Sequence, residues 1–450
     1  MTNLTRRNFV KRSLPASLSL AAGATALIQG PRQVKAAPEK INVAVMGVRG
    51  RGGSLLRIFS RQPEVRLTHV CDVDHGVLDR KIAELEKTTG QKAKAVKDYR
   101  TIIDDPDVQV LVIGTPTHWH ACPTILGCMA GKDIYVEKPD AHNILEGRMM
   151  VKAARKYNRI VQLGTQLRST SHLHAAAAHV KSGGIGKVLY GKAWETDRQG
   201  LVEPKPDSDP PPHVDYDQWL GPAPKRPFNP NRFHGIWRWF FDYGAGDMGN
   251  DGVHRLDMCR MVMGIEQMPT TISATGGKLF FDDAQEWPDT LIATYGFKSS
   301  PTTPPPGSPK APANPGAVIT YEMRLWSRPR LHGATEGVAV YGEEGWVMID
   351  NSSWRAYDPE GNIVIEESNR KANDAHIRNF LDAIRQRSPQ NLNQEIASGH
   401  ISSVLCHGAN IAWRTGKTLR FDTGTETFDE PAANRLLGRE YRKGYELPKV

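Results

Sequence analysis

The chain has 450 residues, of which 39% are hydrophobic and 24% charged, a composition that excludes membrane-embedded and intrinsically disordered proteins. The net charge of +9 falls to +3 when the six lysines and arginines of residues 1–36 are set aside, because that segment contains no acid. Basic charge confined to one terminal segment is poor evidence for a nucleic-acid-binding protein, so we expect no nucleic acid partner.

Residues 1–36 have the features of an export signal. Arg6 and Arg7, followed by Phe9 and Lys11, match the twin-arginine (Tat) consensus, and a weakly apolar run follows at 14–28. That run is too short to span a bilayer. We therefore expect a Tat signal peptide, a processed chain that starts near Ala37 in the periplasm, and no membrane attachment after processing. Since this pathway exports folded proteins, a cofactor can be loaded in the cytoplasm.

Residues 37–165 alternate between short apolar runs and amphipathic segments. Expected strands lie at 41–48, 65–74, 108–116, 133–139 and 159–166, and expected helices at 52–62, 77–90, 120–132 and 144–158. Fully apolar strands separated by helices predict a parallel sheet that is covered on both faces. The segment is therefore predicted to be an α/β Rossmann nucleotide-binding domain.

Residues 166–450 follow a different pattern, with strands grouped together. A helix at 173–184 and a strand at 187–197 precede a Pro-rich loop at 204–230 and a Gly-rich helix at 244–262. Strands are expected at 270–281, 289–297, 317–326 and 337–350, and closing helices at 374–387 and 394–416. This grouping predicts a C-terminal α+β domain with an open antiparallel or mixed sheet, interrupted by a Pro-rich loop at 300–315 without chemistry.

The stretch "GVRGRG", from Gly47 to Gly52, lies between the first strand and the first helix. A Gly-rich turn that opens a helix binds phosphate, because the free N–H groups and the helix dipole favour an anion. Asp72 follows Gly52 by 20 residues at the end of the next strand, where a carboxylate accepts hydrogen bonds from a ribose hydroxyl. The pattern therefore predicts NAD as cofactor.

Arg49 stands where the dinucleotide fingerprint has a glycine. Gly50 can take over the close approach to the pyrophosphate, and the guanidinium of Arg49 or Arg51 can contact a phosphate directly. Because either arginine could also hold a 2′-phosphate, NADP is not excluded.

Five motifs together resemble the Gfo/Idh/MocA family, named after glucose–fructose oxidoreductase, inositol dehydrogenase and a rhizopine-catabolism protein, and in particular its secreted Tat-dependent members. They are "TPTHWH" (115–120), "VEKP" (136–139), "GTQLRS" (164–169), "WLGPAP" (219–224) and "GNDGVHRLD" (249–257). The resemblance implies an NAD(P)-dependent sugar, glycoside or cyclitol oxidoreductase. It also implies a homo-oligomer, a dimer or tetramer, formed through the open sheet.

The resemblance further implies roles for individual residues. Lys138 would hydrogen-bond the reacting hydroxyl, Glu137 would help to hold the nicotinamide end, and the Lys138–Pro139 bond would be cis. The expected cofactor-binding residues are Gly47, Arg49, Gly50, Arg51, Gly52, Asp72, Thr115, His120, Glu137, Lys138 and Gln166.

The family places an aspartate and a histidine four residues apart on one helix, and this chain has Asn250 and His254 there. In a regular α-helix, Asp247, Asn250, His254 and Asp257 share one face. Histidine titrates near neutrality, so His254 is predicted to be the general base, with Lys138 as the orienting cation or the two roles exchanged. Asn250 is expected to position a hydroxyl, and Asp247 to supply any carboxylate that Lys138 requires.

Substrate contacts are expected from Arg168, Trp237, Tyr243 and Asp257. The aromatic segment 235–243, which also contains Arg238, is consistent with a sugar-stacking wall or with ordinary core packing. His118 and His120 have metal-like spacing, but the sequence offers no third ligand, so we expect no metal.

Two enzymatic interpretations remain open. The first is an oxidoreductase that transfers a hydride between NAD(P) and a sugar or polyol. The second is a redox-neutral epimerase, lyase or glycosidase whose tightly bound NAD is regenerated in each cycle, which suits a compartment without a pool of cofactor. A non-catalytic binding protein is less favoured, because Lys138 and His254 are both present.

Overall fold

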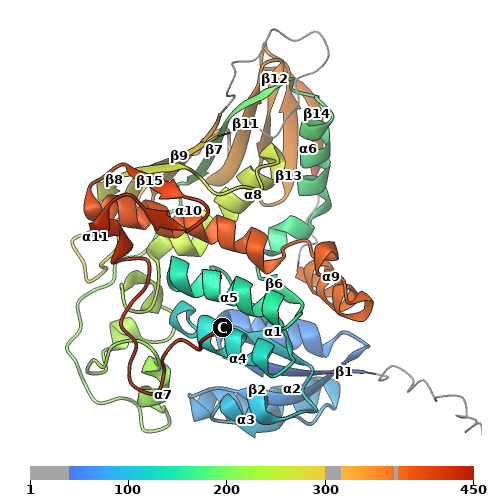
Figure 1. The fold of residues 1–450 in the computed structure, drawn as a ribbon, viewed down its shortest axis with the longest axis vertical. Helices are drawn as coiled ribbons and strands as arrows, with labels where there is room; N and C mark the ends of the chain where they lie inside the picture. The colour runs from blue at the N-terminus through green and yellow to red at the C-terminus, as the bar shows by residue number, and fades with distance from the viewer. Residues whose placement is uncertain (1–39, 299–315, 369–372) are drawn as a thin grey trace, which may run out of the picture. The chain divides into compact units, whose positions relative to one another are not determined.

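Six parallel strands form the first sheet, in the order β3-β2-β1-β4-β5-β6 (Figure 1). The computed structural model describes residues 40–298, 316–368 and 373–450. The strands are β1 (Ile41–Met46), β2 (Val65–Cys71), β3 (Lys94–Val96), β4 (Val110–Ile113), β5 (Asp133–Val136) and β6 (Val161–Leu163). This order confirms the Rossmann fold, and the chain reverses direction across the sheet between β1 and β4. The short strand β3 was not predicted, because it is largely exposed and has no apolar run.

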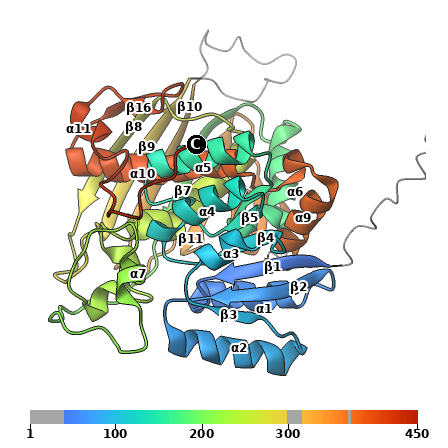
Figure 2. The ribbon, with the colours of Figure 1, turned by 60° about the horizontal axis from the view of Figure 1, so that its bottom comes forward.

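Helices cover both faces of this sheet (Figures 1 and 2). One hydrophobic cluster joins it to α1 (Gly50–Ser60) and α2 (His75–Thr89), and another joins it to α3 (Arg100–Asp104), α4 (Ala121–Met129) and α5 (Ile144–Lys156). Because both faces are buried, β1, β4 and β5 consist almost entirely of apolar residues.

The chain returns to this domain near its end. Helix α9 (Asn373–Gln386) packs against the α1 face of the first sheet. The ring of Phe380 lies 6.5 Å from that of Phe59 and 5.8 Å from that of Tyr135. A helix that follows the strands of the second domain in sequence therefore belongs to the core of the first.

Ten strands form the second sheet, in the order β14-β13-β12-β11-β7-β10-β9-β8-β15-β16. They are β7 (Val188–Glu195), β8 (Thr271–Gly277), β9 (Thr290–Phe297), β10 (Ala317–Arg324), β11 (Glu336–Gly342), β12 (Gly345–Ile349), β13 (Ser353–Tyr357), β14 (Ile363–Ser368), β15 (Leu419–Asp422) and β16 (Thr427–Phe428). Strands β7 and β10 are parallel and the other neighbours antiparallel, which confirms the predicted mixed sheet. The last two hairpins, β13–β14 and β15–β16, were not predicted, because β14 is almost entirely exposed and has no buried apolar run, and β16 has only two residues.

Helices α6 (Ser171–Lys181), α8 (Val253–Met263) and α10 (Ile396–Thr415) pack on one face of the second sheet (Figure 1). Short helices α7 (Tyr216–Leu220) and α11 (Pro431–Asn434) lie in connecting segments. In β9 and β10, Leu291 and Ile319 point into the core, whereas Ile292 and Val318 are 55% and 39% exposed on the opposite face. That face is not covered by a helix in the described parts of the chain.

Two predicted features lie outside the described residues: the export signal at 1–36 and the Pro-rich loop at 300–315. Among the helices that are described, none combines the length and apolar character needed to cross a bilayer.

Replacing Phe380 with alanine tests the docking of α9. We expect the free energy of unfolding to fall by about 3–5 kcal/mol, the cost of truncating a buried phenylalanine, as measured by urea denaturation. Ile363→Ala on β14, where the side chain is 53% exposed, is the matched control and should change stability little. An equal effect of the two changes would contradict the packing described for α9.

Candidate active site

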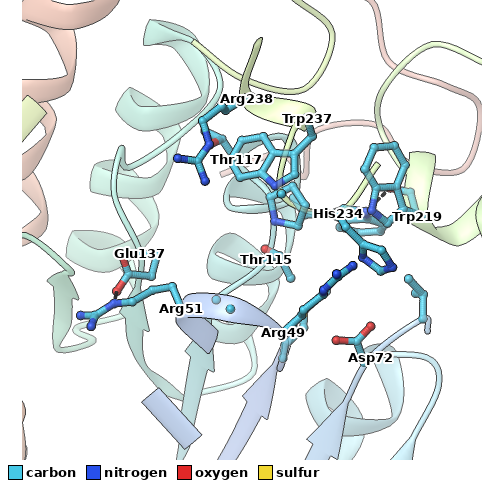
Figure 3. Close-up of a pocket in the computed structure, with 18 of the residues that line it drawn as sticks. Arg49, Arg51, Asp72, Thr115, Thr117, Glu137, Trp219, His234, Trp237 and Arg238 are labelled. Carbon is cyan, nitrogen blue, oxygen red and sulfur yellow. Dashed lines mark hydrogen bonds and ion pairs between the residues drawn. The ribbon is translucent and has the colours of Figure 1, made fainter. Parts of the chain in front are cut away.

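A cavity of about 430 Å³ lies at the carboxyl ends of β1, β4 and β5, where the strand order reverses (Figure 3). Two later segments and His254 complete its wall, through Phe233, His234, Gly235, Trp237, Arg238, Ala245, Gly246, Gly249 and Asn250. Open α/β sheets bind ligands at this edge, so the cavity is the candidate active site. The predicted residues that line it are Gly47, Arg49, Gly50, Arg51, Asp72, Thr115, Glu137, Lys138, Gln166, Trp237, Asn250 and His254.

The glycine turn between β1 and α1 is built for an anion. Gly47 and Gly50 have φ angles of 75° and 48°, in the region that favours glycine. A Cβ on Gly52 would lie 1.7 Å from the carbonyl oxygen of Gly47, so no other residue fits there. Arg49 has an extended backbone, with φ −90° and ψ 160°, which an arginine adopts without strain. This geometry explains why the fingerprint tolerates an arginine at that position.

The first turn of α1 contains no acidic residue, and no side chain caps it. Its leading N–H groups therefore remain available to a phosphate beside the lining residues Gly50 and Arg51.

Asp72 stands at the cavity just beyond β2. One of its carboxylate oxygens accepts from the backbone N–H of Val48 at 2.8 Å and the other from that of Asp74 at 2.9 Å. These bonds fix the carboxylate but leave each oxygen a further lone pair for a hydroxyl group. Burial raises the pKa of Asp72, although the two backbone bonds favour its charged form. A phosphate cradle and a fixed carboxylate at this spacing fit a dinucleotide such as NAD.

The segment 197–236 covers the Asp72 end of the cavity. The carboxylate of Asp74 lies 3.1 Å from Nε2 of His234, and Asp74 and Val214 form an isolated antiparallel bridge. Burial and the nearby Arg49 lower the pKa of His234 to about 4, so this imidazole is neutral at physiological pH. His234 and Arg49 point toward each other beside Asp72 (Figure 3). No periodic pattern predicted these contacts, because the segment is Pro-rich and irregular.

Glu137 and Lys138 follow β5 and enter the cavity from the neighbouring strand end. Glu137 accepts from Nε of Arg51 at 2.7 Å, so this arginine is held on the Glu137 side, away from Asp72 (Figure 3). The Lys138–Pro139 bond is cis, as the resemblance implied. His120 does not line the cavity, and its ring nitrogens lie 2.8 Å and 3.0 Å from the carbonyl oxygens of Pro139 and Thr115. The predicted cofactor contact of His120 is therefore corrected: the ring hydrogen-bonds two backbone carbonyl groups and does not reach the cavity.

The side-chain amide of Asn250 connects the charged residues at the Lys138 end of the cavity. Its side-chain oxygen accepts from Nζ of Lys138 at 3.1 Å and from Nη1 of Arg238 at 3.0 Å. Its side-chain nitrogen donates to Asp247 at 3.1 Å and to Asp251 at 2.8 Å. An amide has two acceptor sites and two N–H groups, so all four are used within the protein. The expectation that Asn250 positions a substrate hydroxyl is therefore corrected, since the amide has no group left for one.

Lys138 is half-buried and makes a second bond, from Nζ to the backbone oxygen of Asn250 at 2.5 Å. An ammonium group has three N–H donors, so one remains for a ligand. Burial is the largest cause that lowers the pKa of Lys138, opposed by the charges of Asp251 and Glu137. Within the described residues, no ion pair joins Lys138 to a carboxylate, and Asp247 reaches it only through the Asn250 amide.

His254 lines the same cavity and is 8% exposed. Its Nδ1 has no hydrogen-bond partner in the described part of the chain. Burial and the charges of Lys138 and Arg255 lower its pKa well below the ordinary value of 6.5. The ring is therefore neutral near pH 7, the form of histidine that can accept a proton.

The helix that begins this motif is not regular. Residues Met248–Gly252 form a π-helical turn, and α8 starts at Val253. The wider turn changes the rotation per residue, so the single face expected for residues 247–257 is not formed. Asp247 lies behind Asn250, 1% exposed, where burial and Asp251 raise its pKa. π turns of this kind are frequent at functional sites.

Arg168, Tyr243 and Asp257 do not line the cavity, so their predicted substrate contacts are corrected. Nε of Arg168 lies 2.9 Å from Asp257, which also accepts from Gln394 and Ser402 at 2.8 Å and 2.6 Å. Tyr243 is fully buried against the ring of Trp219. Sequence spacing could not separate these core residues from the lining.

Arg238 and Trp237 do line the cavity. For these two residues of the aromatic segment, a place in the cavity wall is therefore favoured over core packing. Trp239 and Phe240 of the same segment are core residues, exposed by 7% and 5%. His118 is buried with Nε2 2.9 Å from the carbonyl oxygen of Trp219, so this nitrogen is occupied by the protein itself.

Comparison with known families gives two matches that together cover most of the chain. The model of the NAD-binding Rossmann fold of the Gfo/Idh/MocA oxidoreductase family matches residues 41–165. The model of the C-terminal alpha/beta domain of the same family matches residues 185–295 and 357–447.

Curated relatives match over part of their length. "Glycosyl hydrolase family 109 protein 1" of Shewanella sp. (strain ANA-3) is 27% identical over 211 residues, 43% of this chain and 46% of that protein. Levoglucosan dehydrogenase of Pseudarthrobacter phenanthrenivorans is 28% identical over 176 residues, 38% of this chain and 37% of that protein. The chain thus spans less than half the length of these relatives.

Solved structures share the fold over nearly their whole length. The aldose-aldose oxidoreductase of Caulobacter crescentus, complexed with glycerol, superimposes with a TM-score of 0.62 at 19% identity, covering 85% of this chain and 100% of that one. Levoglucosan dehydrogenase in complex with NADH and levoglucosan has a TM-score of 0.62 at 16% identity, with coverage of 85% and 100%. At sequence identities of 16–19%, this similarity shows a shared fold only.

Gly52→Ala tests the phosphate cradle. Because the added Cβ would collide with the Gly47 carbonyl, the turn must shift, and we expect the affinity for NAD to fall at least about 10-fold, which corresponds to about 1.4 kcal/mol. Titration calorimetry with NAD measures the loss, and Arg57→Ala, at an exposed position on the same helix, is the control. Unchanged affinity in a folded Gly52→Ala protein would refute the assignment of this turn.

Proposed function

Because this chain belongs to the Gfo/Idh/MocA oxidoreductase family, we propose that it oxidises or reduces a hydroxyl-bearing carbon of a sugar, glycoside or cyclitol with NAD. One observation carries the proposal: Lys138 and His254 line the same cavity as the glycine turn and Asp72. The glycine turn with Asp72, the ammonium group of Lys138 and the neutral imidazole of His254 therefore line one cavity.

When NAD is bound, it supplies the carbon that accepts or returns the hydride. His254 accepts the proton of the reacting hydroxyl, since its ring lines the cavity and is neutral. The remaining N–H of Lys138 donates to the alkoxide oxygen that develops as the proton leaves. The cation and the base thus act on one oxygen atom, and the bonds from Lys138 to Asn250 keep the ammonium in place.

A redox-neutral reaction, an epimerisation, elimination or glycoside cleavage with regenerated NAD, is the second candidate. The cover that segment 197–236 forms over the Asp72 end, tied by the Asp74–His234 pair, supports slow release of a bound cofactor. The similarity to a protein named for glycosyl hydrolase family 109 also favours it. Mass spectrometry of the nucleotide that copurifies with the protein, together with its redox state, distinguishes the redox-neutral reaction from net oxidation or reduction. NAD that stays bound and is not reduced overall during turnover supports the redox-neutral reaction.

We also propose that the protein is exported by the Tat pathway to the periplasm, on the evidence of Arg6, Arg7 and the apolar run that follows them. Replacing both arginines with lysine should retain the protein in the cytoplasm in cell fractionation. Correct export of this variant would contradict the proposal.

The uncovered face of the second sheet supports a homo-oligomer. Ile292 and Val318 expose apolar side chains on neighbouring strands of that face. Light scattering should give a dimer or tetramer, and Ile292→Asp should reduce the mass to that of one chain. A single-chain mass for the unaltered protein would exclude this part of the proposal.

The catalytic proposal is tested with purified protein, NAD and a panel of sugars, glycosides and inositols. Absorbance of NADH and chromatography of the sugar products should reveal a keto sugar or an altered glycoside. If no member of the panel is changed, the proposed function is wrong.

Lys138→Met should lower kcat/KM about 100- to 1,000-fold, the loss typical of one electrostatic donor at a developing oxyanion. Lys97→Met is a matched control, because Lys97 is an exposed lysine at the Asp72 end of the same cavity. The two variants should bind NAD comparably, and equal losses of kcat/KM would contradict the role of Lys138.

The pH dependence of kcat/KM follows from the two shifted groups. Since the pKa of His254 is lowered, the base stays unprotonated as the pH falls, and the acid limb should lie below pH 6.5. Since the pKa of Lys138 is lowered, its proton is lost before that of a free lysine, so the alkaline limb should lie below pH 10.5. An acid limb above pH 6.5 that disappears in His254→Asn would contradict the environment described for this histidine.

A further inference from the structure

Arg238 stands at the substrate end of the cavity and forms no ion pair within the described part of the chain. Its one hydrogen bond in the described structure runs from Nη1 to the side-chain oxygen of Asn250, a neutral acceptor. Its Nε is buried and has no partner. A guanidinium has five donors in a planar fork, and desolvated cations are normally matched by an anion.

The charges around the cavity are divided between its two ends. The lining carboxylates are Asp72, Asp74 and Glu137. Asp72 and Asp74 lie at the covered end, and Glu137 is bonded to Arg51. Figure 3 shows Arg238 and Arg51 on the Glu137 side and Arg49 on the Asp72 side.

The substrate end therefore presents two cations, Lys138 and Arg238, that share the neutral Asn250 amide. Asp247 and Asp251 reach that amide from its nitrogen, and neither lines the cavity. His254 adds no charge, because its pKa is lowered. Asp251, Glu137 and Asp247 act on Lys138 over a distance, and Asp247 also acts on Arg238, but within the described residues neither cation forms an ion pair with a carboxylate.

We propose that the substrate is a sugar bearing an anionic group, a carboxylate or a phosphate, that the guanidinium of Arg238 binds while Lys138 holds the reacting hydroxyl. Trp237, whose ring lies 5.9 Å from the Arg238 guanidinium, supplies an apolar face to the sugar ring beside the charged group. Arginine suits both anions, because its fork makes two parallel bonds to either. The inference rests on the proposed function and narrows its substrate class.

The test compares matched pairs on the NAD-loaded protein. Titration calorimetry and turnover are measured for methyl β-D-glucuronide against methyl β-D-glucoside, and for glucose 6-phosphate against glucose. We expect at least one anionic member to bind about 10- to 100-fold more tightly than its neutral counterpart, the range of a charged hydrogen bond. The pair that shows the preference identifies the carboxylate or the phosphate.

Arg238→Gln should reduce that preference to near unity, and Arg238→Lys should retain part of it, because the charge remains but the fork is lost. Lys97→Gln removes a lining cation at the Asp72 end, at an exposed residue outside the expected cofactor-binding set, and should leave the preference unchanged. Bound NAD verifies that each variant is folded.

Neutral sugars that bind or react as well as the anionic ones would overturn this inference and leave the proposed function standing. A preference that survives in Arg238→Gln would overturn it as well. If no sugar of either kind binds or reacts, the proposed function falls and this inference falls with it.

Discussion

The arrangement of charges at the Lys138 end of the cavity depends on the side-chain amide of Asn250, whose hydrogen-bonding groups are all used within the protein. This amide separates two cations, Lys138 and Arg238, from two carboxylates, Asp247 and Asp251, with one hydrogen bond to each. An aspartate in this place would face both carboxylates at hydrogen-bond distance, and like charges so close raise each other's pKa. A neutral amide avoids this repulsion, so the asparagine suits a chain whose neighbouring positions 247 and 251 are acidic.

A second constraint ties the turn after β6 to helices α8 and α10. Asp257, on α8, is bonded to Arg168, which follows β6, and to Ser402 on α10. Asp257 also lies 3.6 Å from the fully buried Arg260, so removing Asp257 would leave Arg168 and Arg260 without this carboxylate, which is strongly unfavourable. Because Gln166 and Arg168 belong to the same short turn, this ion pair also fixes the place where Gln166 enters the cavity. Residues that looked like substrate contacts therefore hold the site together from behind.

The two ends of the cavity have different physical characters. At the Asp72 end, backbone N–H groups and an irregular covering segment surround the place that fits the dinucleotide. At the Lys138 end, fixed cations and a neutral histidine face the open space. Preorganised charges in a water-poor cavity interact more strongly than in water, which gives a few side chains large effects on binding and catalysis.

The sequence by itself determined the Rossmann sheet, the glycine turn with Asp72 and the pair Lys138 and His254, because apolar periodicity and short motifs act locally along the chain. Tertiary structure alone decided that α9 belongs to the first core, that Asp257 binds Arg168, and that Asn250 is saturated. These depend on contacts between residues far apart in the sequence, and on a π turn that helical periodicity does not anticipate. The covering of the Asp72 end by segment 197–236 has the same origin, since irregular segments take their path from the surfaces they meet.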